Sequence, residues 1–298
     1  MLLDELVNRC YNRDMQRDRT SQCLDCTYGK YCTGDCQECL KNVHFQKGDR
    51  PHREYDCQHM ADCYYCKYAY RYASEIVYGL SCFKDILDYN ELNVLSVGCG
   101  PCTDLAGIDF LRNTGELNFS RLNYVGVDPL ANVWKPIWDD ILRFYDVEII
   151  PQDIFQYVDY LVQNDWVPDV IIFQYVFSDM RKNSDREQIL RFIDKIVDFV
   201  NNQKKPICIL CNDINLTADF GGGINFFNDL AKRVSEPKDY RYTHFNNSNR
   251  EKHFEYGIEC RNNSLVFGEI PDYIKDKYNP FDSCASAQML IEKLCEIQ

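Results

Sequence analysis

The segment Asn93–Asp104 contains the residue types of a nucleoside-binding turn. An apolar stretch ends at Val97, the turn Gly98–Pro101 follows, and helical spacing of apolar residues covers 104–113. Glycines at such a turn let the backbone approach a ligand where a Cβ atom would clash. The N-terminus of the next helix offers free N–H groups and the positive end of a dipole. A ligand site is therefore predicted where the first strand ends.

Acidic residues follow the next two predicted strands. Asp128 ends the apolar run Tyr124–Asp128, and Asp153 follows Val147–Ile150. A carboxylate in the first of these positions can accept two hydrogen bonds from a ribose diol, and one in the second can reach an adenine amino group. The dinucleotide fingerprint requires a further glycine where this chain has Thr103, so NAD is a poor fit.

Four segments resemble the ordered motifs of class I S-adenosylmethionine-dependent methyltransferases. Gly-Cys-Gly-Pro followed by Thr-Asp resembles motif I, and Val-Gly-Val-Asp ending at Asp128 resembles the second motif. Gln-Asp-Ile at 152–154 resembles the third, and Pro168–Asp179 resembles the fourth-strand motif. The resemblance covers residues 91–298. It implies an α/β fold with a seven-stranded, mostly parallel, Rossmann-like sheet and helices on both faces.

By position, the resemblance also implies which residues bind the cofactor S-adenosylmethionine. Its methionine part would pack on Gly98, Cys99 and Gly100, with the amino group near Asp104. The ribose would bind Asp128, the adenine Gln152, Asp153 and Ile154, and the sulfonium would lie beside Gln174 and Tyr175. Pro101 and Pro129 complete this predicted cofactor site. Asp104 and Asp153 have a simpler alternative role, which is to cap the helices that they precede.

The residues that would assist methyl transfer are less well defined. The reaction requires alignment of nucleophile, methyl carbon and sulfur, and in some cases a proton acceptor. Tyr175 and Asp179 are the predicted catalytic residues, and Asp213 and His244 are further candidates. No Asn-Pro-Pro-Tyr-type motif follows the fourth strand, which argues against amino-group methylation of adenine or glutamine by that route.

Cysteines are concentrated near the N-terminus. Ten of the 17 lie in the first 82 residues, and several form Cys-x-x-Cys pairs. Such pairs suit zinc because a tight turn brings two thiolates onto one ion, and eight cysteines would complete two tetrahedral sites. An iron–sulfur cluster is the alternative. The predicted metal ligands are Cys23, Cys26, Cys32, Cys36, Cys39, Cys57, Cys63 and Cys66. Cys99, Cys102, Cys208 and Cys211 are instead expected to be packed core side chains.

Three regions are predicted. Residues 1–70 form the small metal-stabilised cysteine-rich domain, residues 71–90 a linking helix, and residues 91–298 the methyltransferase domain. Strands are expected at Asn93–Val97, Tyr124–Asp128, Val147–Ile150, Asp169–Phe173 and Ile207–Cys211, with a closing pair at Ser264–Phe267 and Ser286–Glu292. Helices are expected around 104–113, 135–145, 154–163 and 185–202.

Charge and composition limit the partners. The net charge is −13, and it lies entirely beyond residue 72, so the body of the protein repels a phosphate backbone. No stretch approaches the roughly 20 apolar residues that a membrane helix needs, and the first residues do not resemble a targeting signal. A cytoplasmic protein without membrane contact is therefore expected. Oligomeric state is not predicted.

Three functions remain open. The first is methylation of a macromolecule, RNA foremost, contacted through the zinc domain, whose aromatic and basic residues could stack bases. The second is methylation of a small molecule or peptide, with the metal domain as lid or dimer element. The aromatic pair Trp134 and Trp138 favours this alternative. The third is a non-catalytic adaptor, suggested by Ser96 and Cys102 where the family usually has an acid and a glycine.

Overall fold

The computed structural model describes residues 1–17, 34–44, 53–83, 87, 90–216, 218–234, 240–245 and 263–293, of which 240–245 are described by their backbone. Its strands are β1 (Glu91–Val97), β2 (Arg121–Val127), β3 (Glu148–Ile150), β4 (Val170–Gln174), β5 (Ile207–Ile214), β6 (Tyr240–Phe245) and β7 (Ser286–Lys293). Its helices are α1 (Leu2–Gln16), α2 (Cys36–His44), α3 (Gln58–Ser81), α4 (Thr103–Thr114), α5 (Ala131–Ile141), α6 (Ile154–Gln163), α7 (Val176–Asn183), α8 (Arg186–Asn201), the 3₁₀ turn η2 (Ala218–Phe220), α9 (Ile224–Val234) and α10 (Asp272–Tyr278).

The strands form one sheet in the order β3-β2-β1-β4-β5-β7-β6. β1 to β5 are parallel, whereas β7 runs antiparallel to both β5 and β6. The prediction of an α/β fold with a mostly parallel sheet is confirmed. Because the strand order reverses between β1 and β4, a crevice opens at their carboxyl ends, where ligands bind in open α/β sheets.

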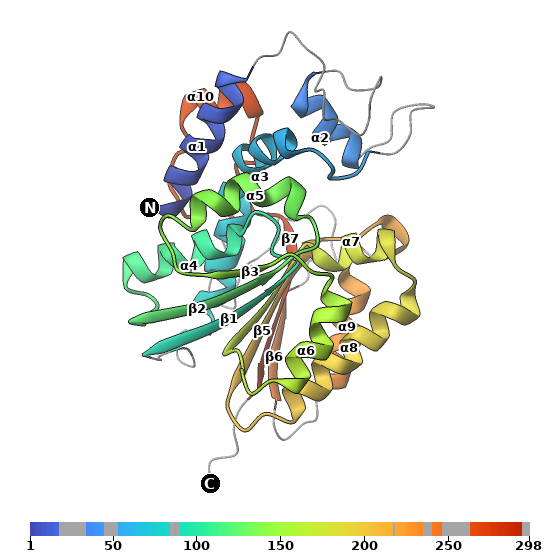
Figure 1. The fold of residues 1–298 in the computed structure, drawn as a ribbon. Coiled ribbons are helices and arrows are strands. Elements are labelled where there is room, and N and C mark those ends of the chain that lie inside the picture. The colour runs from blue at the N-terminus through green and yellow to red at the C-terminus, as the bar shows by residue number, and fades with distance from the viewer. Residues whose placement is uncertain are drawn as a thin grey trace.

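Continuous apolar runs explain why the central strands are buried on both faces. β4 reads Val-Ile-Ile-Phe-Gln and is buried along its apolar length, as expected for a parallel strand covered by helices. Figure 1 shows α1, α3, α4 and α5 together on one side of the sheet, and α6, α8 and α9 on the other. α8 has a strong apolar stripe, and Asp185 caps it by accepting a 2.7 Å hydrogen bond from Gln188 N.

The helix expected at 71–90 begins much earlier, at Gln58, and ends at Ser81. This helix, α3, therefore crosses the boundary that was placed at residue 70. It packs against α1, α4 and α5 and reaches β5 and β7. Gly107 of α4 allows this close packing, because a Cβ atom there would lie 2.9 Å from Ala73 O. The N-terminal helices α1 and α3 thus lie on one face of the sheet.

The prediction of a closing pair of strands is correct for one of its two segments and wrong for the other. Ser286–Lys293 is a strand, but its partners are β5 and the unpredicted β6. Within Ser264–Phe267, only Ser264 forms a bridge, with Ser283. The left-handed Gly268, at φ 74°, turns the chain just after this segment. Within the described part of the chain, no helix is long and apolar enough to span a bilayer.

Candidate functional site

The turn after β1 adopts a conformation that its glycines make possible. Gly98 and Gly100 have φ values of 61° and 49°, in the left-handed region. At Gly98 a Cβ atom would also lie 2.6 Å from Cγ2 of Val176, the first residue of α7. Cys102 has a φ of 55° where α4 begins. The turn therefore brings bare backbone to the carboxyl end of the sheet, as the sequence predicts.

Asp128 at the end of β2 binds this turn. Its Oδ2 accepts a 2.9 Å hydrogen bond from Gly100 N, and its Oδ1 accepts one of 2.8 Å from Leu130 N. Burial raises the pKa of Asp128 to about 6, although these two backbone donors oppose the rise. A carboxylate has about four acceptor positions. Two of them remain for a ligand above the turn.

A cavity of about 250 Å³ lies over the turn. Its volume is slightly below the range of about 300–1,000 Å³ usual for small-ligand sites. Ten of the predicted cofactor residues line it: Gly98, Cys99, Gly100, Pro101, Asp128, Pro129, Asp153, Ile154, Gln174 and Tyr175. The predicted catalytic residue Asp179 also lines it. The sequence thus identifies one continuous site.

Two predicted cofactor residues, Asp104 and Gln152, do not line the cavity. Asp104 is buried in the first turn of α4, where it accepts hydrogen bonds from Tyr124 Oη at 2.9 Å and from Leu105 N at 3.0 Å. Burial raises the pKa of Asp104. Asp153 combines both roles that the sequence allowed, because it faces the cavity and caps α6 through Phe155 N at 2.7 Å.

Sequence reasoning missed most of the opposite wall of the cavity. Tyr64 and Tyr72 of α3, with the preceding Tyr55, line it together with Trp134 of α5. We call these four residues, with Tyr175, the ring wall. Ring centroids lie 5.2 Å apart for Tyr64 and Trp134, 5.7 Å for Tyr55 and Tyr64, and 4.2 Å for Tyr72 and Tyr175. A helical repeat of tyrosines at 64, 68 and 72 was the available signal.

Trp134 carries a buried donor in the wall of the cavity. Its side chain is 3% exposed, and its Nε1 is buried and has no hydrogen bond of ordinary geometry to the described residues. The indole lies close enough to Asp128 to lower the pKa of that carboxyl. Trp134 therefore adds to the polar surroundings of Asp128.

The end of β4 ties the ring wall to the sheet. Gln174 Oε1 accepts a 2.8 Å hydrogen bond from Thr103 Oγ1, and its Nε2 donates one of 2.9 Å to Tyr72 O. Tyr175 has a left-handed backbone, and its Oη donates a 2.8 Å hydrogen bond to Glu75 Oε2. Burial, with the charge of Glu75, raises the pKa of Tyr175 well above its usual value. Its phenol therefore stays protonated and bonded to Glu75.

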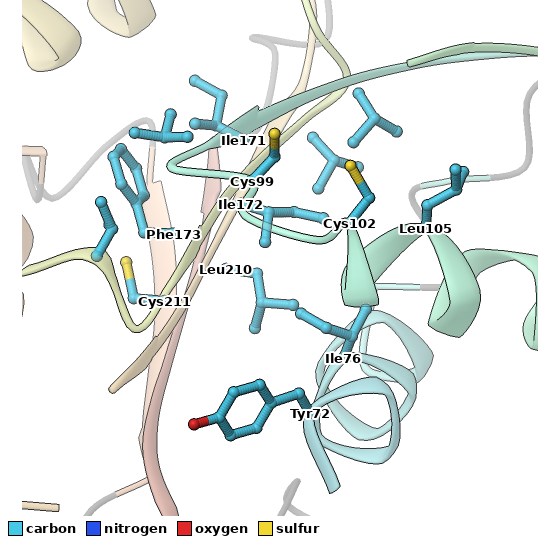
Figure 2. Close-up of a cluster of buried hydrophobic side chains, with 14 of the residues drawn as sticks. Tyr72, Ile76, Cys99, Cys102, Leu105, Ile171, Ile172, Phe173, Leu210 and Cys211 are labelled. Atoms are coloured by element: carbon cyan, nitrogen blue, oxygen red, sulfur yellow. The ribbon is translucent and has the colours of Figure 1, made fainter. Parts of the chain in front are cut away.

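Figure 2 shows how α3 meets this end of the sheet, with Tyr72 and Ile76 of α3 beside Leu210 and the β4 side chains. Cys99, Cys102 and Cys211 point into the same apolar cluster. These three cysteines and Cys208 are all buried, which confirms them as packed core residues. Cys99 alone among them also borders the cavity.

Asp213 and His244 are the remaining catalytic candidates, and Asp213 does not line the cavity. His244 belongs to β6, whose side chains are not described. Asp213 of β5 is buried and accepts a 2.9 Å hydrogen bond from Ser178 N near the start of α7. Burial raises the pKa of Asp213 to about 7. It therefore supports the helix that carries Asp179.

The raised pKa of Asp213 predicts a pH effect on stability. An unfolded aspartate releases its proton near pH 4, so between that value and about 7 the folded state binds more protons and stability falls as pH rises. From pH 6 to 8 the loss is about 1 kcal/mol, or about 2–4 °C in melting temperature. Asp213→Asn should remove this part of the slope in thermal melts, whereas Asp159→Asn, at an exposed position of α6, should not. Equal slopes in all three proteins would contradict the assignment.

The predicted metal ligands do not form a common site in the described part of the chain, where no group of three or more Cys, His, Asp or Glu side chains is placed to hold an ion. Cys36 of α2 hydrogen-bonds to Cys63 of α3. Cys39 and Cys57 pack separately, with Val43 and Met60. Cys66 lies on α3, 3.8 Å from Val7 O. The other three predicted ligands, Cys23, Cys26 and Cys32, lie outside the described residues.

Comparison with known proteins gives no family. No family model matches the chain, and no curated protein matches it. Similar solved structures include the plantazolicin methyltransferase BpumL in complex with SAH, with 12% identity over 97% of this chain and 99% of that one, at a TM-score of 0.45. The mitomycin 7-O-methyltransferase MmcR has 14% identity over 76% of this chain and 54% of its own, with a TM-score of 0.41. An rRNA methylase from Streptococcus thermophilus has 14% identity over 71% and 92%, with a TM-score of 0.37.

Proposed function

We propose that this chain is an S-adenosylmethionine-dependent methyltransferase. One observation carries the proposal, namely the cavity at the carboxyl ends of β1, β2 and β4, which has the glycine turn as its floor and Asp128 at its edge. An open α/β sheet binds nucleosides at this position, where the strand order reverses.

The residues around the cavity fit the cofactor. Asp128 retains acceptor positions for a ribose diol, and Asp153, with Ile154, offers one acceptor and an apolar surface to an adenine ring. Gly98 and Gly100 have left-handed backbone conformations, and both line the cavity at the turn. Asp104 is not part of this set, so the amino group must bind elsewhere.

Bound S-adenosylmethionine supplies an activated methyl group, and the protein has only to bind, align and exclude water. Tyr175 and Tyr72 stack beside the turn and close the cavity toward α3. Asp179 is about half exposed and is the carboxylate on the α7 side of the cavity. We assign Tyr175 the positioning role and Asp179 the role of proton acceptor.

Calorimetry tests the proposal directly. Titration with S-adenosylmethionine and with its product S-adenosylhomocysteine should each give saturable one-to-one binding, and each ligand should raise the melting temperature. NAD should do neither, because Thr103 replaces the third glycine of the dinucleotide turn. If neither S-adenosylmethionine nor S-adenosylhomocysteine binds, or if NAD binds tightly, the proposal is refuted.

The acceptor is better explained as a small molecule or peptide than as RNA. In the described residues, Tyr64 and Tyr72 line the cavity, α1 and α3 pack on the helices that cover the sheet, and α2 packs on α3. These rings are therefore not on an open surface where bases could stack. RNA retention on a filter that falls with salt would support the RNA alternative. Turnover of bound cofactor in a cell extract would exclude the non-catalytic adaptor.

Zinc binding stays a prediction for this chain. A structural site needs four ligands, and among the predicted ligands that the structure describes, Cys36 lies beside Cys63 and Cys39 packs in one cluster with Cys57. These residues alone do not fit a tetrahedral ion, and no step of the reaction is assigned to one. Metal analysis of the purified protein decides between zinc, an iron–sulfur cluster and neither.

A further inference from the structure

The two sides of the cavity differ in chemistry. The side formed by β1, β2 and β3 presents the glycine turn, Asp128 and Asp153, which the proposed function assigns to the nucleoside. The other side is the ring wall, together with Val176, Asp179 and Met180 of α7. An acceptor must approach from this second side. Its chemistry can therefore be inferred from the rings and from the one carboxylate there.

Asp179 faces the ring wall across the cavity. Burial raises the pKa of Tyr55, of Tyr64 and of Asp128, and the negative charge of Asp179 adds to each of these rises. The carboxylate is thus within electrostatic range of both aromatic residues and of the cofactor side. Lys182 pairs with Asp179 at 2.7 Å, but it does not line the cavity.

The lining carries acid but no base. Among the described residues that border the cavity there are three aspartates and no lysine, arginine or histidine. Burial keeps the phenols of Tyr55, Tyr64 and Tyr72 neutral, because each pKa lies well above the usual value. A carboxylate, phosphate or phenolate acceptor would meet only negative charge here. A cation would gain both from Asp179 and from the ring faces.

We propose that the methyl acceptor is an amine that arrives as a cation and binds between the ring wall and Asp179. This inference rests on the proposed function and names its substrate class. The ammonium group lies beside Tyr64, whose ring packs edge to face with Trp134 at a centroid distance of 5.2 Å, and Asp179 is its counter-ion. Aromatic faces with a nearby carboxylate are an established way to recognise ammonium groups.

Atoms and charges balance when the methyl group is transferred from the sulfonium to an amine. The ammonium first releases one proton to Asp179 or to water, which leaves a lone pair on nitrogen. That pair forms the N–CH₃ bond while the S–CH₃ bond breaks and its electrons remain on sulfur. The products are the methylated ammonium and S-adenosylhomocysteine. The positive sulfonium favours the first step, because a neighbouring like charge lowers the pKa of an ammonium.

A matched pair of ligands tests the inference without turnover. Choline carries a quaternary ammonium, and 3,3-dimethylbutan-1-ol has the same shape with carbon in place of the charged nitrogen. With S-adenosylhomocysteine bound, calorimetry should show choline binding about 3- to 30-fold more tightly, the range that a cation over aromatic rings supplies. Choline mimics the fully methylated head group and cannot react, so only recognition is measured.

Two variants test whether Asp179 is responsible for the preference for choline. Asp179→Asn should weaken choline binding about 3- to 10-fold, because it removes the counter-ion, and leave the neutral alcohol unchanged. Asp159→Asn, the exposed control on α6, should change neither ligand. Equal affinity for the two ligands, no measurable choline binding, or tighter binding of the anion 3,3-dimethylbutyrate would overturn the inference. If S-adenosylhomocysteine binds in the same samples, the proposed function stands whichever of these results is obtained.

Discussion

Replacing Asp128 by asparagine should weaken binding of S-adenosylhomocysteine by about 100-fold or more. The carboxylate accepts hydrogen bonds from Gly100 N and Leu130 N, and in the proposed complex it also accepts from the ribose diol. A hydrogen bond to a charged group contributes about 1.5–3 kcal/mol, and each 1.4 kcal/mol corresponds to about tenfold in affinity. Asparagine has one acceptor oxygen and turns two donors toward groups that are themselves donors.

The pH dependence of binding provides a second measurement on the same residue. Burial raises the pKa of Asp128 to about 6, so below that pH the free protein holds a neutral carboxyl group. The affinity of the unchanged protein should therefore fall as pH is lowered from 8 to 5, and that of Asp128→Asn should stay flat. The exposed control Asp159→Asn should follow the unchanged protein. Unaltered affinity in Asp128→Asn would contradict the placement of the ribose.

Replacing Arg13 by methionine should lower the free energy of unfolding by about 3–5 kcal/mol. Arg13 of α1 bonds to Asp62 of α3 at 2.7 Å and also to Asp140 of α5. The two aspartate side chains are only 8% and 6% exposed. Removing one partner of a buried ion pair costs about this much, because a buried charge is left uncompensated. Methionine keeps most of the apolar stem, so the loss reports the charge.

Chemical denaturation measures this loss, and α8 provides the matched control. Arg191 pairs with Glu187 at 3.7 Å, and both side chains are largely exposed. Arg191→Met should cost less than about 1 kcal/mol, the usual limit for a surface pair. Arg9 also contacts Asp140, at 3.5 Å, and compensates in part. A loss in Arg13→Met no larger than in Arg191→Met would show that α1 is not held by this network.

The elements that the sequence predicts well are those with a local signal. β1, β2, β4 and β5 coincide with aliphatic runs, and α8 combines an apolar stripe with a capping aspartate. The glycine turn and Asp128 follow directly from β1 and β2. Because parallel strands place their carboxyl ends at one edge of the sheet, short motifs far apart in the chain could be assigned to one site.

The α3 helix shows why the N-terminal part could not be predicted equally well. Cys63 and Cys66 have a Cys-x-x-Cys spacing, which fits a metal-binding turn, but residues three apart also share one face of a helix. Tyr64, Tyr68 and Tyr72 repeat at four residues and so form another face of the same helix. Spacing alone does not separate these two structures. Only the contacts with α1, α4 and the sheet decide it.

The sequence failed to predict the strand β6 and the ring wall for the same reason. The local pattern favours the more aliphatic Ser264–Phe267 as the strand. Tyr240–Phe245 forms the strand instead, because it pairs with β7, a partner distant in sequence. Trp134 was noticed as an aromatic residue, but its neighbours Tyr55 and Tyr64 come from another segment of the chain. Local pattern identifies the cofactor side of the cavity. The acceptor side is assembled by tertiary contacts.

The course of α3 also limits how the protein can be divided. One end of this helix holds Cys63 and Cys66 among the N-terminal helices, and the other brings Tyr72 and Glu75 to the reaction centre. A shortened chain that starts at residue 91 would expose the apolar surface on which α3 lies and would lack half of its substrate wall. α1 and α3 therefore belong to the same packed unit as the sheet. A change that displaces α3 would also displace Tyr72 and Glu75 at the cavity.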